Sequence, residues 1–183
     1  MAERLAGQRI AFLAADGVEQ VELTEPWKAV QQAGGTPTLI SVKAGEIQGF
    51  NHLDKGDRFP VDLVIDHADP DSFDALVLPG GVANPDQLRA DDRMVKFARA
   101  MFESSKPIGV ICHGPWLLVE ADAVRGRTLT SWPSLQTDIR NAGGVWVDEE
   151  VVIDTRLVSS RGPQDLPAFC ATIVEEFAEA RRS

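Results

Sequence analysis

Short apolar runs alternate with segments of helical periodicity along most of the chain. Runs without polar alternation predict strands buried on both faces, and apolar residues three and four positions apart predict amphipathic helices. We expect strands at residues 9–15, 36–42, 58–66, 74–81, 106–112 and 128–132, and a hairpin at 145–160 that turns near residues 154–156. We expect helices at residues 25–35, 91–104, 115–121, 133–144 and 165–182. Asp165 is the expected cap of the last helix.

This alternation predicts one α/β domain over residues 1–183, in which helices cover both faces of a mostly parallel sheet. No Gly/Ser-rich or Pro-rich stretch divides the chain. In such sheets the chemistry lies at the carboxyl ends of the strands. Three strand exits, at residues 16–22, 80–86 and 112–115, carry polar or glycine-rich sequence and are the candidate site.

Composition excludes several classes of function. The formal net charge of -10 and the pI near 4.7 argue against binding to nucleic acid or to an anionic membrane, because phosphates would be repelled. The N-terminal region lacks the apolar stretch of a signal peptide or a membrane helix, so we expect a cytoplasmic protein. There is no zinc pattern, P-loop or GxGxxG motif, and we expect neither metal nor cofactor. His52 and His67 are expected to be surface residues.

Two cysteines are too few for a disulfide framework, so each is considered as a free thiol. Cys170 lies at helical spacing with Leu166 and Ile173, which favours packing in the core. The tryptophans could line a pocket, but packing in the core or against another subunit is the expectation. They are Trp27, Trp116, Trp132 and Trp146.

Cys112 ends a predicted strand just before a helix that begins at Pro115. The positive end of the helix dipole would lower the pKa of its thiol, and Gly114 would allow the tight turn that presents the sulfur. The alternative is that Cys112 is a small buried residue of the core. The neighbouring His113 could act as a base, but only a strained turn would bring the two side chains together.

The other two exits offer groups that could assist such a nucleophile. The N–H groups of Gly80 and Gly81 could form an oxyanion hole, or the pair could be a plain turn. Glu19 and Glu22 are three positions apart and could share a helix face. If one of these acids lies near the sulfur of Cys112, it would be protonated and would donate a hydrogen bond to the sulfur. The alternative is that both are solvated acids at the start of a helix.

Several segments in order resemble the PfpI intracellular-protease family, a branch of the class I glutamine amidotransferase-like superfamily. They are VELTEPWKAVQQAGG, DALVLPGG, KPIGVICHGPWLL, GRTLTSWPSLQTDIRNAGGVWVDEEVV and LVSSRGPQDLPAF. The resemblance spans nearly the whole chain, and its most specific parts are ICHGP and SSRGPQDLPAF. It implies a flavodoxin-like three-layer α/β/α sandwich, a nucleophile elbow at Cys112, and a homodimer or higher oligomer whose interface borders the site.

The resemblance also implies roles for individual residues. The acid that interacts with the cysteine corresponds to Glu22, with Glu19 nearby. In protease-type members an acid from a neighbouring subunit completes a triad with the cysteine and His113, and its position here is Asp86. Aspartate replaces the family's glutamate there and is shorter by about 1.5 Å, which puts proteolysis in doubt.

We therefore expect a stress-response protein in which Cys112 attacks α-oxoaldehydes such as methylglyoxal or their early adducts on protein side chains. In that reaction Glu22 and His113 would move protons, and Gly80 with the His113 N–H would stabilise the oxyanion. One alternative is a cysteine peptidase or amidase that uses Cys112, His113 and Asp86 across a subunit boundary. Another is a redox sensor or chaperone-like protein without turnover.

Overall fold

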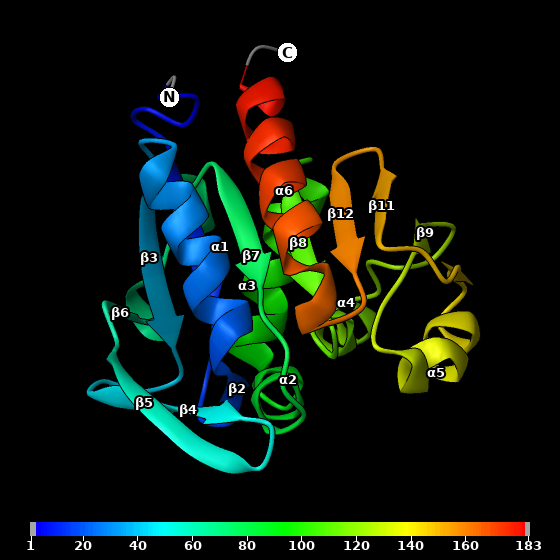
Figure 1. Ribbon diagram of the computed structural model, residues 1–183, viewed down its shortest axis with the longest axis horizontal. Helices are drawn as coiled ribbons and strands as arrows, with labels where there is room; N and C mark the ends of the chain where they lie inside the picture. Colours follow the sequence, from blue (N-terminus) through cyan, green and yellow to red (C-terminus); the bar gives the residue numbers. More distant parts are fainter. Residues whose placement is uncertain (1–2, 182–183) are drawn as a thin grey trace.

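The computed structural model describes residues 3–181 (Figure 1). Its centre is a seven-stranded sheet of order β11-β12-β8-β7-β1-β3-β6, in which only the β11 and β12 pair is antiparallel. These strands are β1 (Arg9–Leu13), β3 (Thr36–Ser41), β6 (Leu63–Val64), β7 (Ala75–Leu78), β8 (Ile108–Ile111), β11 (Val151–Asp154) and β12 (Leu157–Ser160). The fold is thus the flavodoxin-like α/β arrangement with a mostly parallel sheet that the sequence predicts.

Two smaller sheets and six α-helices complete the described chain. One small sheet has the order β2-β4-β5, with β2 (Val18–Glu19), β4 (Glu46–Asn51) and β5 (Asp54–Pro60); the other pairs β9 (Thr128–Leu129) with β10 (Val145–Trp146). The α-helices are α1 (Gln20–Gln32), α2 (Ala83–Arg89), α3 (Asp92–Glu103), α4 (Pro115–Glu120), α5 (Gln136–Asn141) and α6 (Leu166–Ala180). None of the helices within residues 3–181 is long and apolar enough to cross a membrane.

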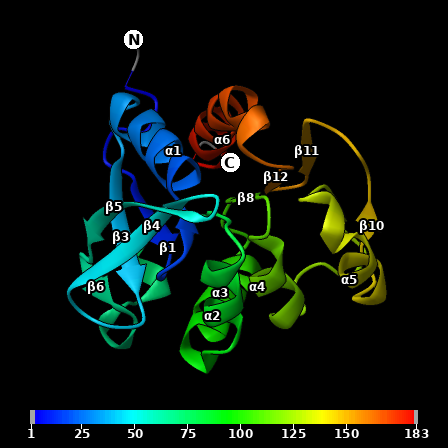
Figure 2. The same ribbon diagram turned by 60° about the horizontal axis from the view of Figure 1, so that its bottom comes forward.

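The helices form layers on both faces of the central sheet (Figure 2). On one face α1 and α6 pack through residues such as Leu23, Phe169 and Ile173. On the other face α3 and α4 pack through residues such as Met94 and Leu117. The inner strands β7, β8 and β12 are buried at every position, as expected for strands covered on both sides. Each face therefore has its own apolar core, and the strand ends are held at fixed positions between the two.

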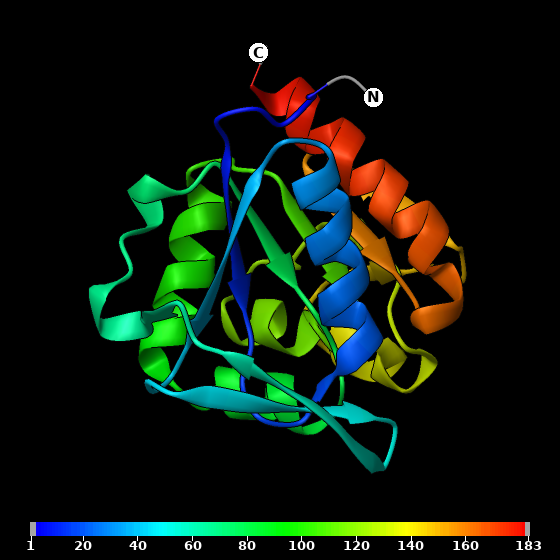
Figure 3. The same cartoon turned by 60° about the vertical axis from the view of Figure 1, so that its left-hand side comes forward.

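The structure differs from the sequence prediction at two segments. The expected strand at residues 58–66 is divided between the end of β5 and the short β6, and the β4–β5 hairpin before it was not predicted. Both hairpin strands are rich in polar residues, β5 has no buried position and β4 buries two of its six residues, so they lack the apolar signal of a core strand. Figure 3 shows this hairpin crossing the lower end of the sheet. Helix α2 was also missed, because it is short and polar on its exposed face.

The hairpin at the end of the sheet is confirmed for residues 151–160, where β11 and β12 are joined at residues 154–157. Its expected start at residue 145 is wrong, because residues 145–146 form β10, which pairs with β9 instead. Asp165 occupies the N-cap position of α6, as expected, but its side chain makes no hydrogen bond to the helix N-terminus. The Asp165 carboxylate instead accepts hydrogen bonds from the backbone N–H and the guanidinium of Arg161, at 2.9 to 3.0 Å. The pair fixes the turn between β12 and α6.

Candidate functional site

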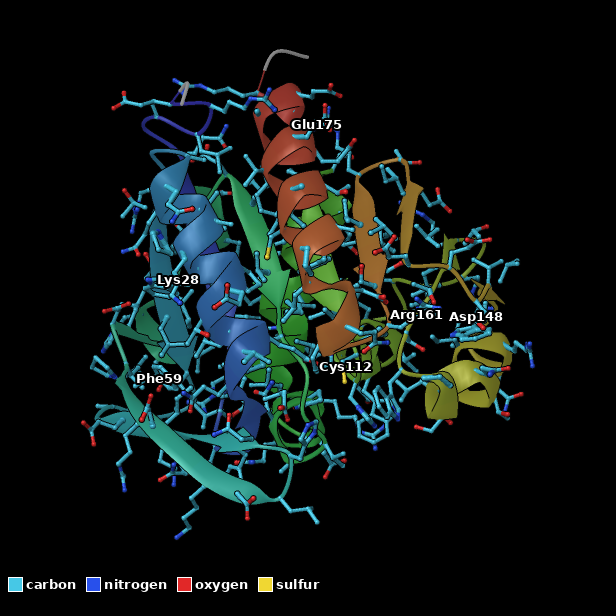
Figure 4. All side chains as sticks on the ribbon, in the orientation of Figure 1. Lys28, Phe59, Cys112, Asp148, Arg161 and Glu175 are labelled. Atoms are coloured by element: carbon cyan, nitrogen blue, oxygen red, sulfur yellow. The ribbon has the colours of Figure 1, made fainter. Side chains whose placement is uncertain are left out.

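Cys112 lies at the carboxyl end of β8, at the turn into α4 (Figure 4). Its φ is 63°, a left-handed conformation that is strained for a residue with a side chain. A Cβ on Gly114 would lie 2.6 Å from the carbonyl oxygen of Leu78, so only glycine fits behind the turn. This backbone conformation is the reason that two consecutive side chains meet: Cys112 Sγ lies 3.2 Å from His113 Nδ1.

Glu22 reaches the same point from α1 and is completely buried. Its Oε2 accepts a hydrogen bond of 2.8 Å from the Gly80 N–H. Its Oε1 has no hydrogen-bond partner among the described residues, although the Cys112 thiol lies close enough to the carboxyl group to influence its pKa. A Cβ on Gly80 would lie 2.4 Å from Glu22 Oε2 and 2.6 Å from the Cys112 Cβ, so the glycine is wedged between acid and nucleophile.

Burial controls the protonation of all three groups. The pKa of Glu22 is raised to about 8, mainly by burial and to a smaller extent by the nearby Glu19, so Glu22 is protonated at neutral pH. Burial lowers the pKa of His113, which is therefore a neutral imidazole. It also raises the pKa of the Cys112 thiol well above its usual range, with a second contribution from the charge of Glu22.

The expected low pKa of Cys112 is therefore wrong for this arrangement. The thiol is 5% exposed and faces an acid, and α4 has only six residues. Loss of hydration outweighs the dipole of so short a helix, and the charge that Glu22 acquires once it is deprotonated adds to the effect at higher pH. The resting site thus contains a neutral thiol, a neutral imidazole and a neutral carboxylic acid.

The backbone donors around the sulfur differ from the expected set. The N–H groups of Gly81 and His113 donate to the Cys112 sulfur. The Gly80 N–H is bonded to Glu22 instead. The Gly80 N–H therefore has a partner in Glu22, whereas the N–H groups of Gly81 and His113 are directed at the sulfur; the expected oxyanion roles of these donors stay predictions.

Asn84, which was not singled out from the sequence, connects two of the strand exits. It is completely buried at the start of α2. Its Oδ1 accepts a hydrogen bond of 2.7 Å from Ala15 N–H, and its Nδ2 donates to the carbonyl oxygens of Pro79 and Gly80 at 3.1 and 3.0 Å. One side chain therefore links the end of β1 to the glycine turn after β7.

Above the cysteine opens a pocket of about 620 Å³, into which Glu19 and Glu22 both face. Glu19 is 8% exposed, and its carboxylate accepts the backbone N–H of His52 at 3.2 Å. His52 is exposed as expected, with 82% of its side-chain surface accessible, yet it also lines this pocket, whereas His67 is exposed and lies outside it.

Asp86 lies outside the pocket of its own chain. Its carboxylate is 60% exposed and is bound by the Arg89 guanidinium at 2.9 Å. Arg89 in turn lies over the Trp116 ring, 4.4 Å from its centroid, and Trp116 contacts the edge of the His113 ring. Within residues 3–181 no hydrogen bond reaches His113 Nε2, and Asp86 makes none to it.

The comparison with known families covers almost all of these elements. The model of the DJ-1/PfpI family matches residues 8–176. The chain belongs to the DJ-1/PfpI family.

Named relatives of this DJ-1/PfpI member carry different functions. The chain is similar to a deglycase of Pyrococcus abyssi, with 43% identity over 91% of this chain and 98% of the relative. It is also similar to two proteins of Bacillus subtilis. General stress protein 18 is 44% identical over 89% of this chain and 94% of its own, and the putative cysteine protease YraA is 41% identical over 88% and 94%.

A solved structure with the same fold is a two-domain protein from Anabaena variabilis with a DJ-1/ThiJ/PfpI-like and a ferritin-like domain. The TM-score is 0.86 at 31% identity, and the match covers 92% of this chain and 47% of that one. The present chain therefore spans about half the length of that protein.

Two further residues that were considered from the sequence of this DJ-1/PfpI member lie in different places, one in the core and one at the site. Cys170 packs against the α1/α6 core, as expected, and burial raises the pKa of its thiol to about 12. Trp132, expected to be packed away, is 38% exposed and lines the pocket, with its ring stacked on His113 at 5.9 Å. Among residues 3–181, no group of three or more His, Cys, Asp or Glu side chains is placed to hold a metal ion.

Proposed function

We propose that the protein is a cofactor-independent, cysteine-dependent enzyme of the stress response that acts on α-oxoaldehydes or on their early adducts on protein side chains. One observation carries the proposal. Cys112 Sγ lies 3.2 Å from the Nδ1 of a neutral His113, with a protonated Glu22 on its other side. Two relatives named deglycases are 43% and 44% identical to this chain over 91% and 88% of its length.

The raised pKa of the thiol requires that deprotonation accompany attack. His113 Nδ1 takes the thiol proton while Sγ forms a bond to the aldehyde carbon, C1. The carbonyl electron pair moves to the oxygen, which is stabilised by the N–H groups of Gly81 and His113. His113 then returns its proton to that oxygen, which gives a neutral hemithioacetal and regenerates the base.

The second half of the reaction moves one hydrogen from C1 to C2. His113 removes the C1 proton and delivers it to C2, while the hydroxyl proton passes from the oxygen on C1 to the oxygen on C2. C1 is thereby oxidised to a thioester and C2 is reduced to an alcohol. Water then hydrolyses the thioester, and the products are a 2-hydroxy acid and the free Cys112 thiol. Glu22 stays neutral and donates toward the sulfur, and Glu19 helps to keep it protonated.

The test is conversion of methylglyoxal to lactate, with lactate itself measured because buffers and thiols trap the aldehyde reversibly. We expect lactate formation with the wild-type protein and none with Cys112→Ser. Cys170→Ser is the matched control, because it removes the other thiol outside the site. Equal lactate formation by wild type and Cys112→Ser would contradict the proposed function.

A second candidate is a peptidase or amidase in which Asp86 of a neighbouring subunit orients His113. Two observations favour it: the unused His113 Nε2 among the described residues, and the relative named a putative cysteine protease. A redox sensor without turnover fits less well, because a buried thiol with a raised pKa contains little of the thiolate that oxidants attack.

A further inference from the structure

The pocket above Cys112 is much larger than methylglyoxal requires. Its volume of about 620 Å³ lies within the range of roughly 300 to 1,000 Å³ that is typical of sites for drug-sized ligands. The sulfur and the oxyanion donors occupy only its base. Most of the space therefore faces the part of a substrate that does not react.

Apolar side chains are prominent at the mouth of this pocket, beside the exposed Asp16, His52 and Gln87. Among the described residues, five large hydrophobic side chains are strongly exposed, and three of them line this one pocket. They are Leu53, Val82 and Trp132, with exposed fractions of 94%, 58% and 38%. A concentration of exposed apolar side chains around a pocket indicates a binding site more than chance exposure does.

Each of these three residues adjoins a residue at the base. Val82 directly follows Gly81, whose N–H faces the sulfur. Leu53 follows His52, whose N–H binds Glu19. Trp132 stacks on His113 and donates its backbone N–H to the Cys112 carbonyl oxygen at 2.9 Å. A substituent that extends outward from the reacting carbon would therefore pass between these three side chains.

The Trp132 ring is a fixed platform. One face lies nearly parallel to His113, at an angle of 23°. The backbone of Gly162 packs against the ring, since a Cβ there would lie 3.1 Å from two ring atoms. A ring held between two neighbours loses little freedom when a ligand stacks on its exposed part.

The charged groups of the pocket restrict the substituent further. Asp16 and Glu19 line the wall, and no lysine or arginine of the described chain does. An anionic substituent, such as a phosphate ester, would meet two carboxylates and no cation. A neutral apolar substituent meets Val82 and Leu53 without this repulsion.

We propose that the mouth formed by Leu53, Val82 and Trp132 is a specificity subsite for a neutral apolar substituent on the reacting carbonyl compound. The preferred substrates are α-oxoaldehydes with a branched or aromatic group, rather than methylglyoxal or phosphorylated aldehydes. The inference rests on the proposed function for the reaction, but the subsite itself can be tested without turnover.

The test compares three alkylating agents that differ only in their substituent: iodoacetamide, N-benzyl iodoacetamide and iodoacetate. In each case a bond forms between Cys112 Sγ and the CH₂ carbon, iodide leaves, and the thiol proton passes to His113 or buffer. Rate constants for labelling of Cys112 are measured by intact mass on Cys170→Ser protein and are divided by those of N-acetylcysteine. We expect a preference for the benzyl reagent over iodoacetamide of about tenfold, and discrimination against iodoacetate.

Two variants at the mouth of the pocket and two matched controls outside it show whether the benzyl preference arises at the mouth. Val82→Ser and Leu53→Ser should each lower the benzyl preference by about threefold. Val145→Ser and Ile153→Ser should leave it unchanged, because these side chains are also exposed (54% and 51%) but lie outside the pocket. All four are surface substitutions, which fold as the wild type does.

Four results would overturn the subsite: a benzyl preference near one, a preference unchanged in both variants at the mouth, failure of every reagent to label Cys112, or a preference for iodoacetate. Sedimentation of wild type and the Leu53→Ser/Val82→Ser double variant tests the other occupant, a second copy of the chain. If an oligomer dissociates in the double variant and the benzyl preference does not change, Leu53 and Val82 belong to an interface between subunits. That result would contradict the proposed subsite. The lactate assay tests the proposed reaction separately. Absence of lactate formation together with a retained preference for the benzyl reagent would contradict only the proposed reaction.

Discussion

Cys112 Sγ and His113 Nδ1 are 3.2 Å apart although the two residues are consecutive in the chain. In an extended strand their side chains would point to opposite faces. The left-handed φ of 63° at Cys112 removes this separation, and the pair forms within one turn rather than between two distant segments. The strength of Cys112 as a nucleophile is set by its surroundings, above all by burial of the thiol, with Glu22 as the second contribution.

Alkylation of Cys112 should depend steeply on pH. Because the pKa of the thiol is raised, the rate with iodoacetamide should be slow at pH 7 and should climb without a plateau through pH 9.5. In Glu22→Gln the charge that Glu22 acquires above about pH 8 is missing, so labelling at pH 9.5 should be faster by roughly tenfold. Glu25→Gln, an exposed substitution on the same helix, should match the wild type. A plateau below pH 8 in the wild type would contradict the raised pKa.

The stability of the fold should also reflect Glu22. In the unfolded chain its pKa is near 4.5, and in the folded protein it is about 8. Between these values only the folded state holds the proton, so the free energy of unfolding falls as pH rises from 4.5 to 8 and changes no further above that. Urea unfolding of wild type and Glu22→Gln at pH 5, 7 and 8.5 measures this. The variant should gain a few kcal/mol relative to the wild type across the range, and a constant difference would exclude a protonated Glu22.

Asn84 is expected to be a positioning residue with a structural cost. Asn84→Ala removes three hydrogen bonds and leaves the buried Ala15 N–H without its partner, so unfolding free energy should fall by about 2–4 kcal/mol. Asn141→Ala, at the exposed end of α5, is the control. Denaturation in urea gives the stability, and labelling of Cys112 at pH 9 shows whether the glycine turn has moved. An unchanged midpoint of unfolding would contradict the linking role of the amide.

Asp86 separates the two candidate enzymes. Asp86→Ala removes an exposed ion pair with Arg89, so stability should change by about 0–1 kcal/mol and lactate formation should persist. Asp122→Ala is the matched control, because Asp122 forms a similar exposed pair with Arg125 three residues later. Peptide cleavage that is lost in Asp86→Ala and kept in Asp122→Ala would favour the peptidase and count against the proposed function.

The sequence predicts the central sheet well because its strands are apolar throughout. The strands that end at Leu13, Leu78 and Ile111 could be placed from such runs, and their exits identified the region of the site. The pKa of Cys112 could not be predicted, because it depends on burial by α1 and α6, which no local pattern reports. The use of the Gly80 N–H by Glu22 was missed for the same reason, since these residues are 58 positions apart.

Asn84 and the β4–β5 hairpin show a second limit. An asparagine before a proline is typical of a turn, and nothing in the neighbouring residues indicates that its amide reaches Ala15. The hairpin consists of short strands rich in polar residues, so neither the hairpin nor Leu53 at its tip was singled out from the sequence. The contribution of Leu53 to the pocket depends on the position of the hairpin across the end of the sheet, which no local sequence pattern indicates.

The exposed mouth of the pocket has a consequence for the evolution of this fold. The reactive base is built from buried strand ends, where most substitutions are costly, whereas Leu53 and Val82 lie on the surface and can be exchanged with little loss of stability. Selection can therefore change which compounds enter without rebuilding the chemistry beneath. Separate control of entry and reaction is one physical route by which relatives with one scaffold come to carry names as different as deglycase and protease.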